Sequence, residues 1–494
     1  MSTDQSSSRR LSVGRATILS LGVEVVNALS ILLSVRYLVH HLGAEQYGIV
    51  ALVGLFASQL GILYFGIGPA VTRRVAEYRG LKDTERIRTV TIAAIASSCV
   101  TSALVGFVFR SAAPWAWTHL FSAQPGAVAS AMGSITLMAG IAATQPLLGT
   151  LLGVFVGEER FSELSGIRLA QGLFRATASV IAVARGGGIE AVLWTYLVTE
   201  LLAIVAALAT VGVSIRGVQH RALVEETRGL LKDGPPFAFA DFCAGLLVNG
   251  DKLAVSVGAS IAQLTFYSVP FNAASRFTIF GSSLSSVLLP RIGHLAAAND
   301  FPEALRLTKR ATRLSVAAMM MVTIPLVAVT PELLRLWLGP EFEARSSTAM
   351  RIVFVGFVIN ASVYAYYAVV RVRSHPLTLT VLYAIELPIF AVLIYVLVPR
   401  YGIEGAAAAW ALRVLLDTVV LRRIAASELK AATGDGKVVW FSALALACFA
   451  CGSLFLPLFM RIGLALVLAG LVFNFLLGVD ELKAIVRSLL RRRS

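Results

Sequence analysis

The sequence predicts an all-α integral membrane protein with about fourteen transmembrane helices. Hydrophobic residues make up 57% of the 494 residues, while charged residues make up only 14%. The apolar residues also fall in runs of about 20, which is the length that a helix needs to cross the hydrocarbon core of a bilayer. A soluble domain of this size would not carry so apolar a surface.

The predicted spans follow one another with short polar connections. In chain order they are residues 16–37, 47–68, 89–109, 128–156, 169–184, 191–213, 237–258, 264–289, 314–338, 349–370, 377–398, 405–421, 438–459 and 462–479. The fourth span carries Gly149, Gly153 and Gly157 on one helical face, a spacing that permits close approach of a neighbouring helix. Proline inside several spans, beginning with Pro146, predicts bends.

The distribution of basic residues predicts the orientation. A formal charge of +15 would also suit a nucleic-acid-binding protein. With a cytoplasmic N-terminus, however, about 31 Lys and Arg residues lie in inside segments and about 7 lie outside. The outside residues are Arg110, Arg185, Arg335, Arg345, Arg351, Arg400 and Arg461. This asymmetry excludes a nucleic-acid partner, places both termini in the cytoplasm and favours an even number of spans.

An internal repeat predicts the domain organisation. A shift of about 220 residues brings Tyr47 into register with Tyr267, and Pro69 close to Pro290. The predicted fold is therefore two six-helix lobes in a parallel pseudo-twofold repeat, followed by two C-terminal helices. The expected divisions are a cytoplasmic tail, the N-lobe, a linker, the C-lobe, the last two spans and a basic tail, at residues 1–15, 16–215, 216–236, 237–425, 426–480 and 481–494.

Loops and cysteines limit the classes of function. No loop is long enough to form a folded domain, which weighs against a membrane-embedded glycosyltransferase or ligase with an external catalytic loop. The four cysteines fall within or at the edge of predicted spans, where neither a disulfide framework nor a zinc site is expected. No metal site and no organic cofactor are predicted, and the membrane bundle itself is expected to carry the function.

Four passages resemble the prokaryotic oligosaccharide and polysaccharide repeat-unit flippases of the multidrug, oligosaccharidyl-lipid and polysaccharide exporter superfamily. They are Arg36-Tyr37-Leu38 with Leu42-Gly43-Ala44-Glu45-Gln46-Tyr47-Gly48, Asn249-Gly250-Asp251-Lys252 with Phe266-Tyr267-Ser268 and Leu284 to Pro290, Leu338-Gly339-Pro340-Glu341-Phe342 with Ala344, and Tyr401-Gly402-Ile403-Glu404-Gly405-Ala406-Ala407. Together they span nearly the whole chain.

The resemblance implies a substrate and a cellular setting. It implies translocation of an undecaprenyl-pyrophosphate-linked saccharide from the inner to the outer leaflet of the bacterial inner membrane, by alternating access. Expected partners are this lipid-linked saccharide, membrane lipids and polysaccharide polymerase or assembly proteins. Three alternatives stay open: a cation-coupled antiporter of the multidrug and toxin extrusion type, a membrane glycosyltransferase or ligase, and a non-transporting assembly scaffold.

Charged side chains inside the spans are the candidate functional residues, because lipid exposure of each would cost about 2.5–3.5 kcal/mol. The set comprises Arg36, Arg175, Lys252, Arg276, Arg413, Glu24, Glu200, Asp241, Asp251, Glu386 and Asp417. Arg276, Arg175, Lys252 and Arg36 are predicted to bind the anionic headgroup. Fixed pairing is the competing interpretation, with Glu200 as the partner of Arg175 and Asp417 as that of Arg413.

Two further groups of residues complete the predicted site. Asn360, Tyr364 and Tyr367 recur at i, i+4 and i+7, and with Asn272 they are candidates for contact with sugars, against a simple packing role. Glu24, Asn27, Glu386 and Asp251 are candidates for coupling to H⁺ or Na⁺, against a structural polar network.

Overall fold

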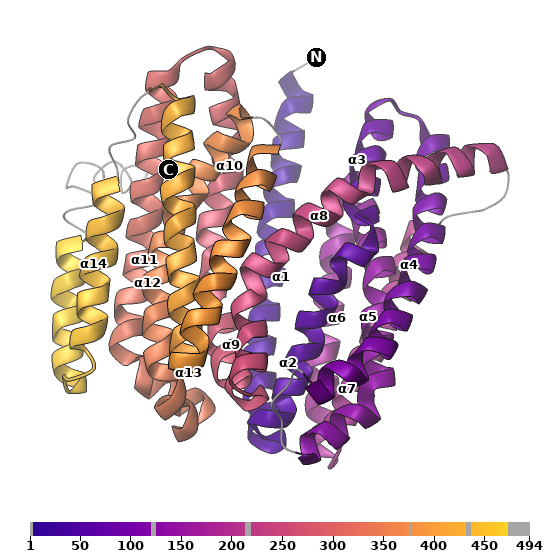
Figure 1. The fold of residues 1–494 in the computed structure, drawn as a ribbon. Helices are drawn as coiled ribbons and strands as arrows, with labels where there is room; N and C mark the ends of the chain where they lie inside the picture. The colour runs from indigo at the N-terminus through magenta and orange to yellow at the C-terminus, as the bar shows by residue number, and fades with distance from the viewer. Residues whose placement is uncertain (1–2, 120–124, 213–218, 375–376, 431–435, 473–494) are drawn as a thin grey trace. The chain divides into compact units, whose positions relative to one another are not determined.

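The structure is a computed structural model that describes residues 3–119, 125–212, 219–374, 377–430 and 436–472. Within these residues it contains helices and no strands (Figure 1). The chain divides into two compact units, Met1–Thr265 and Phe266–Ser494, called here unit 1 and unit 2. The predicted all-α fold class is confirmed.

Unit 1 contains eight long or medium helices and one short 3₁₀ segment in the part of the chain that is described. These are α1 (Thr3–Leu42), α2 (Ala44–Gln59), η1 (Leu60–Tyr64), α3 (Ile67–Gly80), α4 (Thr84–His119), α5 (Pro125–Gly157), α6 (Phe161–Ala184), α7 (Ile189–Val211) and α8 (His220–Gly258). Two apolar clusters hold the unit together. One joins α3 to α4 and α8, and the other joins α5 to α6 and α7.

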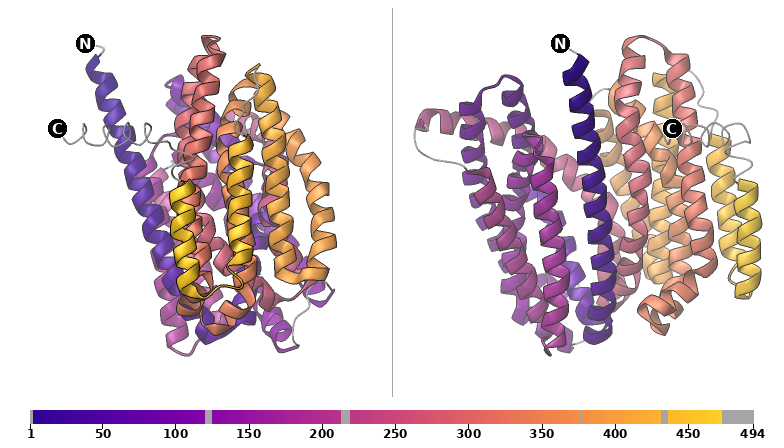
Figure 2. Two further views of the ribbon diagram at one scale, coloured as in Figure 1. Left: turned by 90° about the vertical axis from the view of Figure 1, so that its left-hand side faces the viewer. Right: turned by 180° about the vertical axis from the view of Figure 1, so that it is seen from behind.

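Unit 2 begins within α9 (Ile261–Ser275). It continues with η2 (Arg276–Thr278), α10 (Ile279–Ala297), α11 (Phe301–Leu338), α12 (Pro340–Arg373), α13 (Leu377–Glu428) and α14 (Gly436–Gly452). One apolar cluster joins α10, α11, α12 and α13. A last described helix, Leu458–Val472, lies beside α14 (Figure 2).

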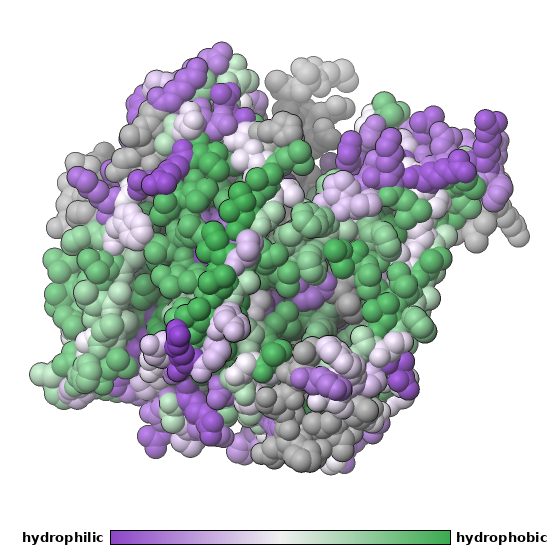
Figure 3. Space-filling model, viewed as in Figure 1, coloured by the Kyte–Doolittle hydropathy of each residue, from purple (hydrophilic) through white to green (hydrophobic). Residues whose placement is uncertain are grey.

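The helices are long and apolar enough to cross a membrane. Eight helical stretches of the described chain meet length and hydropathy criteria for a span. Shorter apolar helices cover Ala44–Phe56, Gly436–Gly452 and Leu458–Val472. On the face drawn in Figure 3, the surface of unit 1 is mainly apolar across its middle and polar where α3 and the start of α8 lie. The protein is therefore a multi-pass membrane protein.

Two predicted spans are interrupted by short 3₁₀ segments, at similar places in the predicted repeat. The span 47–68 passes from α2 through η1, and the span 264–289 passes from α9 through η2. After η1 the chain turns at Phe65 and Gly66, which both adopt positive φ, and α3 begins at Ile67. A 3₁₀ segment within a helix is typical of a hinge or of a sequence under strain.

Helix α8 includes most of the predicted linker. It runs without interruption from His220 to Gly258, although Pro235 and Pro236 lie inside it. Its backbone at Gly234 passes very close to the turn before α3, because a Cβ atom on Gly234 would lie 2.0 Å from the Phe65 carbonyl oxygen. A side chain at this position would separate the two segments.

Two of the short motifs have a backbone explanation. Gly339 adopts a φ of 103° between α11 and α12, and Pro340 follows at the start of α12. Gly402 has φ 54° and ψ −128°, which divides α13 into two helical arms. These conformations favour glycine because it lacks a Cβ atom.

Glycine also sets the distance between α3 and α5. The Thr72 hydroxyl donates a hydrogen bond of 2.9 Å to the Gly153 carbonyl. A Cβ atom on Gly157 would lie 2.8 Å from the Thr72 carbonyl oxygen, whereas one on Gly149 would meet nothing within 4 Å. The prediction of close helix packing is confirmed for Gly153 and Gly157.

Substitution of Gly157 with Ala is expected to lower the free energy of unfolding by about 1–3 kcal/mol, because the added methyl group forces α3 and α5 apart. Gly149→Ala is the matched control on the same face, and it should leave stability unchanged or slightly raised. Thermal unfolding of the detergent-solubilised protein measures both. Equal effects of the two substitutions would contradict this account of the packing.

Candidate functional site

Unit 1 contains a half-open cavity of about 700 Å³. Its walls come from α2, η1, α3, α5, α6, α7 and α8. The polar side chains that line it are Tyr64, Thr72, Gln145, Thr150, Arg168, Arg175, Tyr196, Glu200 and Asp241. Backbone at Gly66, Gly68, Gly149 and Gly153 also faces the cavity, so small residues provide part of its space.

Arg175 and Glu200 form an ion pair that joins α6 to α7 in the wall of this cavity. Glu200 is only 4% exposed, and the Gln171 amide donates a second hydrogen bond of 2.9 Å to its other carboxylate oxygen. The Tyr196 ring lies against the guanidinium, with 4.9 Å from its centroid to Arg175 Cζ. Charge, hydrogen bond and aromatic contact together position Arg175.

The local backbone of α6 and α7 supports this arrangement. The Ser179 hydroxyl donates a hydrogen bond of 2.7 Å to the Arg175 carbonyl, and it also lies within hydrogen-bond distance, 2.9 Å, of the Thr195 hydroxyl. These contacts keep one face of α6 against α7, so Arg175 and Glu200 meet. Pairing of these two residues, one of the two interpretations that the sequence left open, is what the structure shows.

Two more charged side chains line the cavity, Arg168 on α6 and Asp241 on α8. Both are exposed, and neither forms an ion pair with another described residue. Asp241 was one of the charged candidates in the predicted spans, but it had no assigned role. Arg168 lies just before the predicted span 169–184, and neither it nor Gln145 was named as a site residue. The available signal was a polar residue beside a proline in an apolar span, as at Gln145 and Pro146.

The other predicted site residues of unit 1 lie outside this cavity. Lys252 is 2% exposed. Its ammonium group donates hydrogen bonds of 3.1 Å to Asn249 Oδ1 and 3.3 Å to the Val248 carbonyl. Asp251 is fully buried. Arg36 is exposed near the end of α1. None of the three is part of the cavity lining.

Asn27, a coupling candidate of α1, lies against α6. The Asn27 amide donates a hydrogen bond of 3.3 Å to the Arg168 carbonyl. A Cβ atom added to Gly172 would lie 2.2 Å from Asn27 Oδ1. Asn27 therefore fits against the glycine surface of α6. The side chain of Glu24 lies outside the described residues.

Unit 2 holds the remaining predicted residues. Arg276 and Asn272 are exposed at the end of α9 and the start of η2. The ring of Tyr364 occupies the space that a side chain on Gly281 would need. The centroid of the Tyr367 ring lies 5.9 Å from Arg371 Cζ. Asn360 is half-buried.

Glu386 and Asp417 share one guanidinium in unit 2. Arg413 Nε lies 3.7 Å from Glu386, and Arg413 Nη2 lies 3.7 Å from Asp417. The three residues come from the two arms of α13, and Glu386 is 1% exposed. The predicted contact of Arg413 with Asp417 is confirmed, and Glu386 is an additional member of the cluster.

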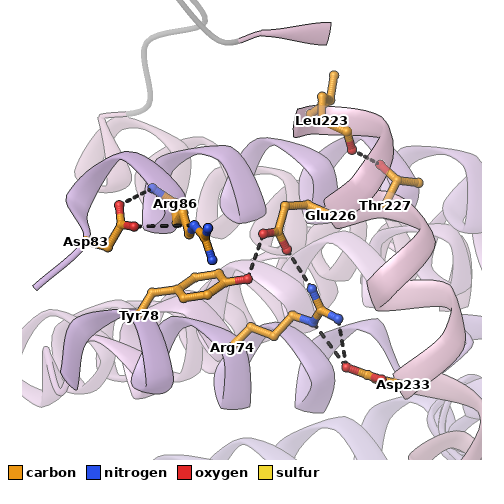
Figure 4. A network of polar contacts seen from close by, with 8 residues as sticks. All are labelled: Arg74, Tyr78, Asp83, Arg86, Leu223, Glu226, Thr227 and Asp233. Carbon is orange, nitrogen blue, oxygen red and sulfur yellow. Dashed lines mark hydrogen bonds and ion pairs between the residues drawn. The ribbon is translucent and has the colours of Figure 1, made fainter. Parts of the chain in front are cut away.

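A polar network joins α3 to α8 on the side that the sequence places in the cytoplasm (Figure 4). Arg74 donates hydrogen bonds of 2.7 Å to Glu226 and 2.9 Å to Asp233. The Tyr78 hydroxyl donates a hydrogen bond of 2.7 Å to Glu226. Burial and the hydrogen bond to Glu226 raise the pKa of Tyr78 above its ordinary value. Since α3 and α8 also line the cavity, this network positions two of its walls.

Comparison with known proteins assigns the chain to a family. Residues 13–296 match the sequence profile of the family described as polysaccharide biosynthesis protein, which is more than half of the chain. The chain belongs to this family. The resemblance to polysaccharide repeat-unit flippases is confirmed. The matched region contains every residue of the cavity lining.

A sequence relative and two solved structures agree with the assignment. A putative O-antigen transporter of Shigella flexneri is 24% identical over 181 residues, which are 36% of this chain and 42% of that protein, so the match spans less than half of the relative. Lipid II flippase MurJ in an inward closed conformation has a TM-score of 0.67 at 12% identity, covering 95% of this chain and 99% of its own. An inward-facing multidrug resistance MATE family transporter of the MOP superfamily has a TM-score of 0.66 at 13% identity, covering 84% and 98%. The chain therefore shares the fold of these two solved structures.

Tyr78→Phe is expected to lower the free energy of unfolding by about 1–2 kcal/mol near neutral pH, because it removes a hydrogen bond to a charged group. The raised pKa of Tyr78 means that this contribution is present below about pH 10 and is lost as the pH rises further. Chemical unfolding in detergent from pH 7 to pH 11 measures the difference from wild type.

Tyr395→Phe is the matched control, since Tyr395 is 81% exposed. It should be neutral at every pH. A Tyr78→Phe deficit that persists unchanged at pH 11 would contradict the assigned role of the hydroxyl.

Proposed function

We propose that this protein is a flippase that moves a lipid-linked saccharide of the undecaprenyl-pyrophosphate type from the inner to the outer leaflet of the bacterial cytoplasmic membrane. The cavity of unit 1 carries the proposal, because it lies wholly within the part of the chain that belongs to the polysaccharide biosynthesis family. Its volume of about 700 Å³ is within the range of about 300–1,000 Å³ that is typical of small-molecule sites.

The chemistry of the cavity lining supports such a substrate. Arg168 and Arg175 provide guanidinium groups, which bind phosphate oxygens through charge-assisted hydrogen bonds. Tyr64, Tyr196 and Gln145 provide aromatic faces and hydrogen-bonding groups for a saccharide. The prenyl tail needs no enclosed site, because it is soluble in the surrounding lipid.

The predicted site residues outside the cavity have proposed roles as well. Lys252, Arg36 and Arg276 would contact the headgroup at other stages of an alternating-access cycle, and Asn272, Asn360, Tyr364 and Tyr367 would contact sugars. The Glu386 cluster would couple the cycle to H⁺ or Na⁺, with Glu24, Asn27 and Asp251 as further candidates. An assembly with polysaccharide polymerase belongs to the same proposal.

One observation favours a second candidate, a cation-coupled drug antiporter. Asp241 places a carboxylate in the cavity with no ion-pair partner among the described residues, which suits a cationic substrate. Arg168 and Arg175 oppose this candidate, because they would repel cationic ligands. Efflux of a cationic dye from cells that express the protein distinguishes the two functions.

Arg175→Ala is expected to reduce the initial rate of flipping by about tenfold or more, because a charge-assisted hydrogen bond contributes about 1.5–3 kcal/mol. Arg168→Ala should reduce it several-fold. The assay follows a fluorescent undecaprenyl-pyrophosphate-linked saccharide in proteoliposomes, by its accessibility to a reductant added outside.

Arg110→Ala is the control, since Arg110 is exposed on α4 and is not part of the cavity lining. It should flip at the wild-type rate. Wild-type proteoliposomes that fail to flip the lipid, or cavity variants that match wild type, would contradict the proposed function or its site.

A further inference from the structure

Glu200 is the most deeply buried charged group of the cavity lining. It is 4% exposed, and its two carboxylate oxygens accept from Arg175 and Gln171. A buried carboxylate without a counter-ion is costly, because it loses its hydration. The charged form of Glu200 therefore depends on Arg175.

Arg175 has the opposite exposure. Its side chain is 34% exposed, compared with 5% for that of Glu200, and both residues line the cavity. The Nη2 atom of Arg175 donates to Glu200, and its Nε atom is buried without a hydrogen-bond partner among the described residues. An anionic group in the cavity would therefore meet the exposed part of the Arg175 guanidinium.

Binding of an anion to Arg175 creates a conflict of charge. The ion pair is neutral overall, so a diphosphate that contacts Arg175 brings negative charge next to the Glu200 carboxylate. Two anions would then share one cation in a buried site, which favours protonation of the more buried carboxylate. The anion favours this protonation whether it displaces the Glu200 carboxylate from Arg175 or shares the guanidinium with it.

The surroundings of Glu200 accommodate the protonated state. Gln171 carries both an amide donor and an amide acceptor, so after rotation its oxygen accepts a hydrogen bond from a carboxylic acid. Tyr196 stays against the guanidinium, so Arg175 keeps its position when Glu200 loses its charge. Proton uptake therefore requires no further rearrangement of the wall.

The other charged and titratable groups around the pair do not supply this proton site. The elements that face α7 or share its cavity contribute Tyr47 on α2, Tyr64 on η1, Arg168 on α6 and Asp241 on α8. Tyrosine and arginine are protonated as residue types near neutral pH, so they offer no site for a further proton. Asp241 is exposed and has no ion pair to lose, so an anion at Arg175 does not deprive it of a counter-ion.

We propose that Glu200 takes up one proton when the phosphate-bearing headgroup of the substrate binds Arg175, so that this ion pair couples substrate binding to protonation. The inference rests on the proposed function for the identity of the anion. It assigns to Glu200 a role that differs from headgroup contact, since Glu200 acts through Arg175. Binding should strengthen as the pH falls, because the bound state holds one proton more than the free state.

Isothermal titration calorimetry tests the proposal with the full-length protein in detergent. The probe is an undecaprenyl-diphosphate-linked monosaccharide, whose esterified diphosphate does not titrate near neutral pH. Titrations at one pH in buffers of different ionisation enthalpy give the number of protons taken up. Wild type should take up about one proton per bound lipid, and its affinity should rise by up to about tenfold per unit decrease of pH.

Two variants separate the candidate groups. Glu200→Gln leaves Arg175 without a competing carboxylate, so this variant should bind with no proton uptake and with little dependence on pH. Asp241→Asn changes the other carboxylate of the lining, and it should retain the wild-type uptake of about one proton per bound lipid, whatever its effect on affinity. The wild-type buffer series alone gives a decisive result if Glu200→Gln does not fold.

The outcomes distinguish the inference from the function on which it rests. Binding by wild type without proton uptake, or uptake that survives in Glu200→Gln and disappears in Asp241→Asn, would overturn the role of Glu200 alone. Failure of wild type to bind the lipid at any pH would overturn the proposed function, and this inference with it.

Discussion

A charged side chain inside an apolar helix bundle needs an opposite charge or water, and this requirement organises the interior of both units. In unit 1 it brings Arg175 on α6 to Glu200 on α7. In unit 2 it brings Arg413 to Glu386 and Asp417 on the two arms of α13. Each cluster connects segments whose other contacts are mostly apolar and non-directional. The ionic contacts therefore add directional contacts to the apolar packing of these segments.

The same requirement gives the cavity of unit 1 its character. Its lining contains two guanidinium groups and two carboxylates, and one of each is already engaged in the Arg175–Glu200 pair. Such a cavity attracts an anion less strongly than a purely basic one. Moderate attraction suits a transporter, which must release its substrate as well as bind it. Protonation of Glu200 would then change the affinity of the cavity for an anion, while the lining residues stay the same.

The spans were predictable because they depend on length and hydropathy, which are local properties of the chain. The η1 and η2 breaks and the continuity of α8 were not, since they depend on backbone contacts such as that of Gly234 with Phe65. Asp241 and Lys252 both lie in the predicted span 237–258, yet only Asp241 lines the cavity. The extent of the cavity is set by neighbouring helices, which a single sequence does not display. The pairing of Arg175 could be foreseen from a carboxylate on the next span.

A double-mutant cycle on Arg175 and Glu200 tests the central claim most directly. The free energy of unfolding is measured in detergent for wild type, Arg175→Gln, Glu200→Gln and the double variant. We expect each single substitution to be destabilising and the double variant to recover part of the loss, with a coupling energy of at least about 1 kcal/mol. Effects that add within about 0.5 kcal/mol would show that the two charges do not depend on each other, and would contradict the account.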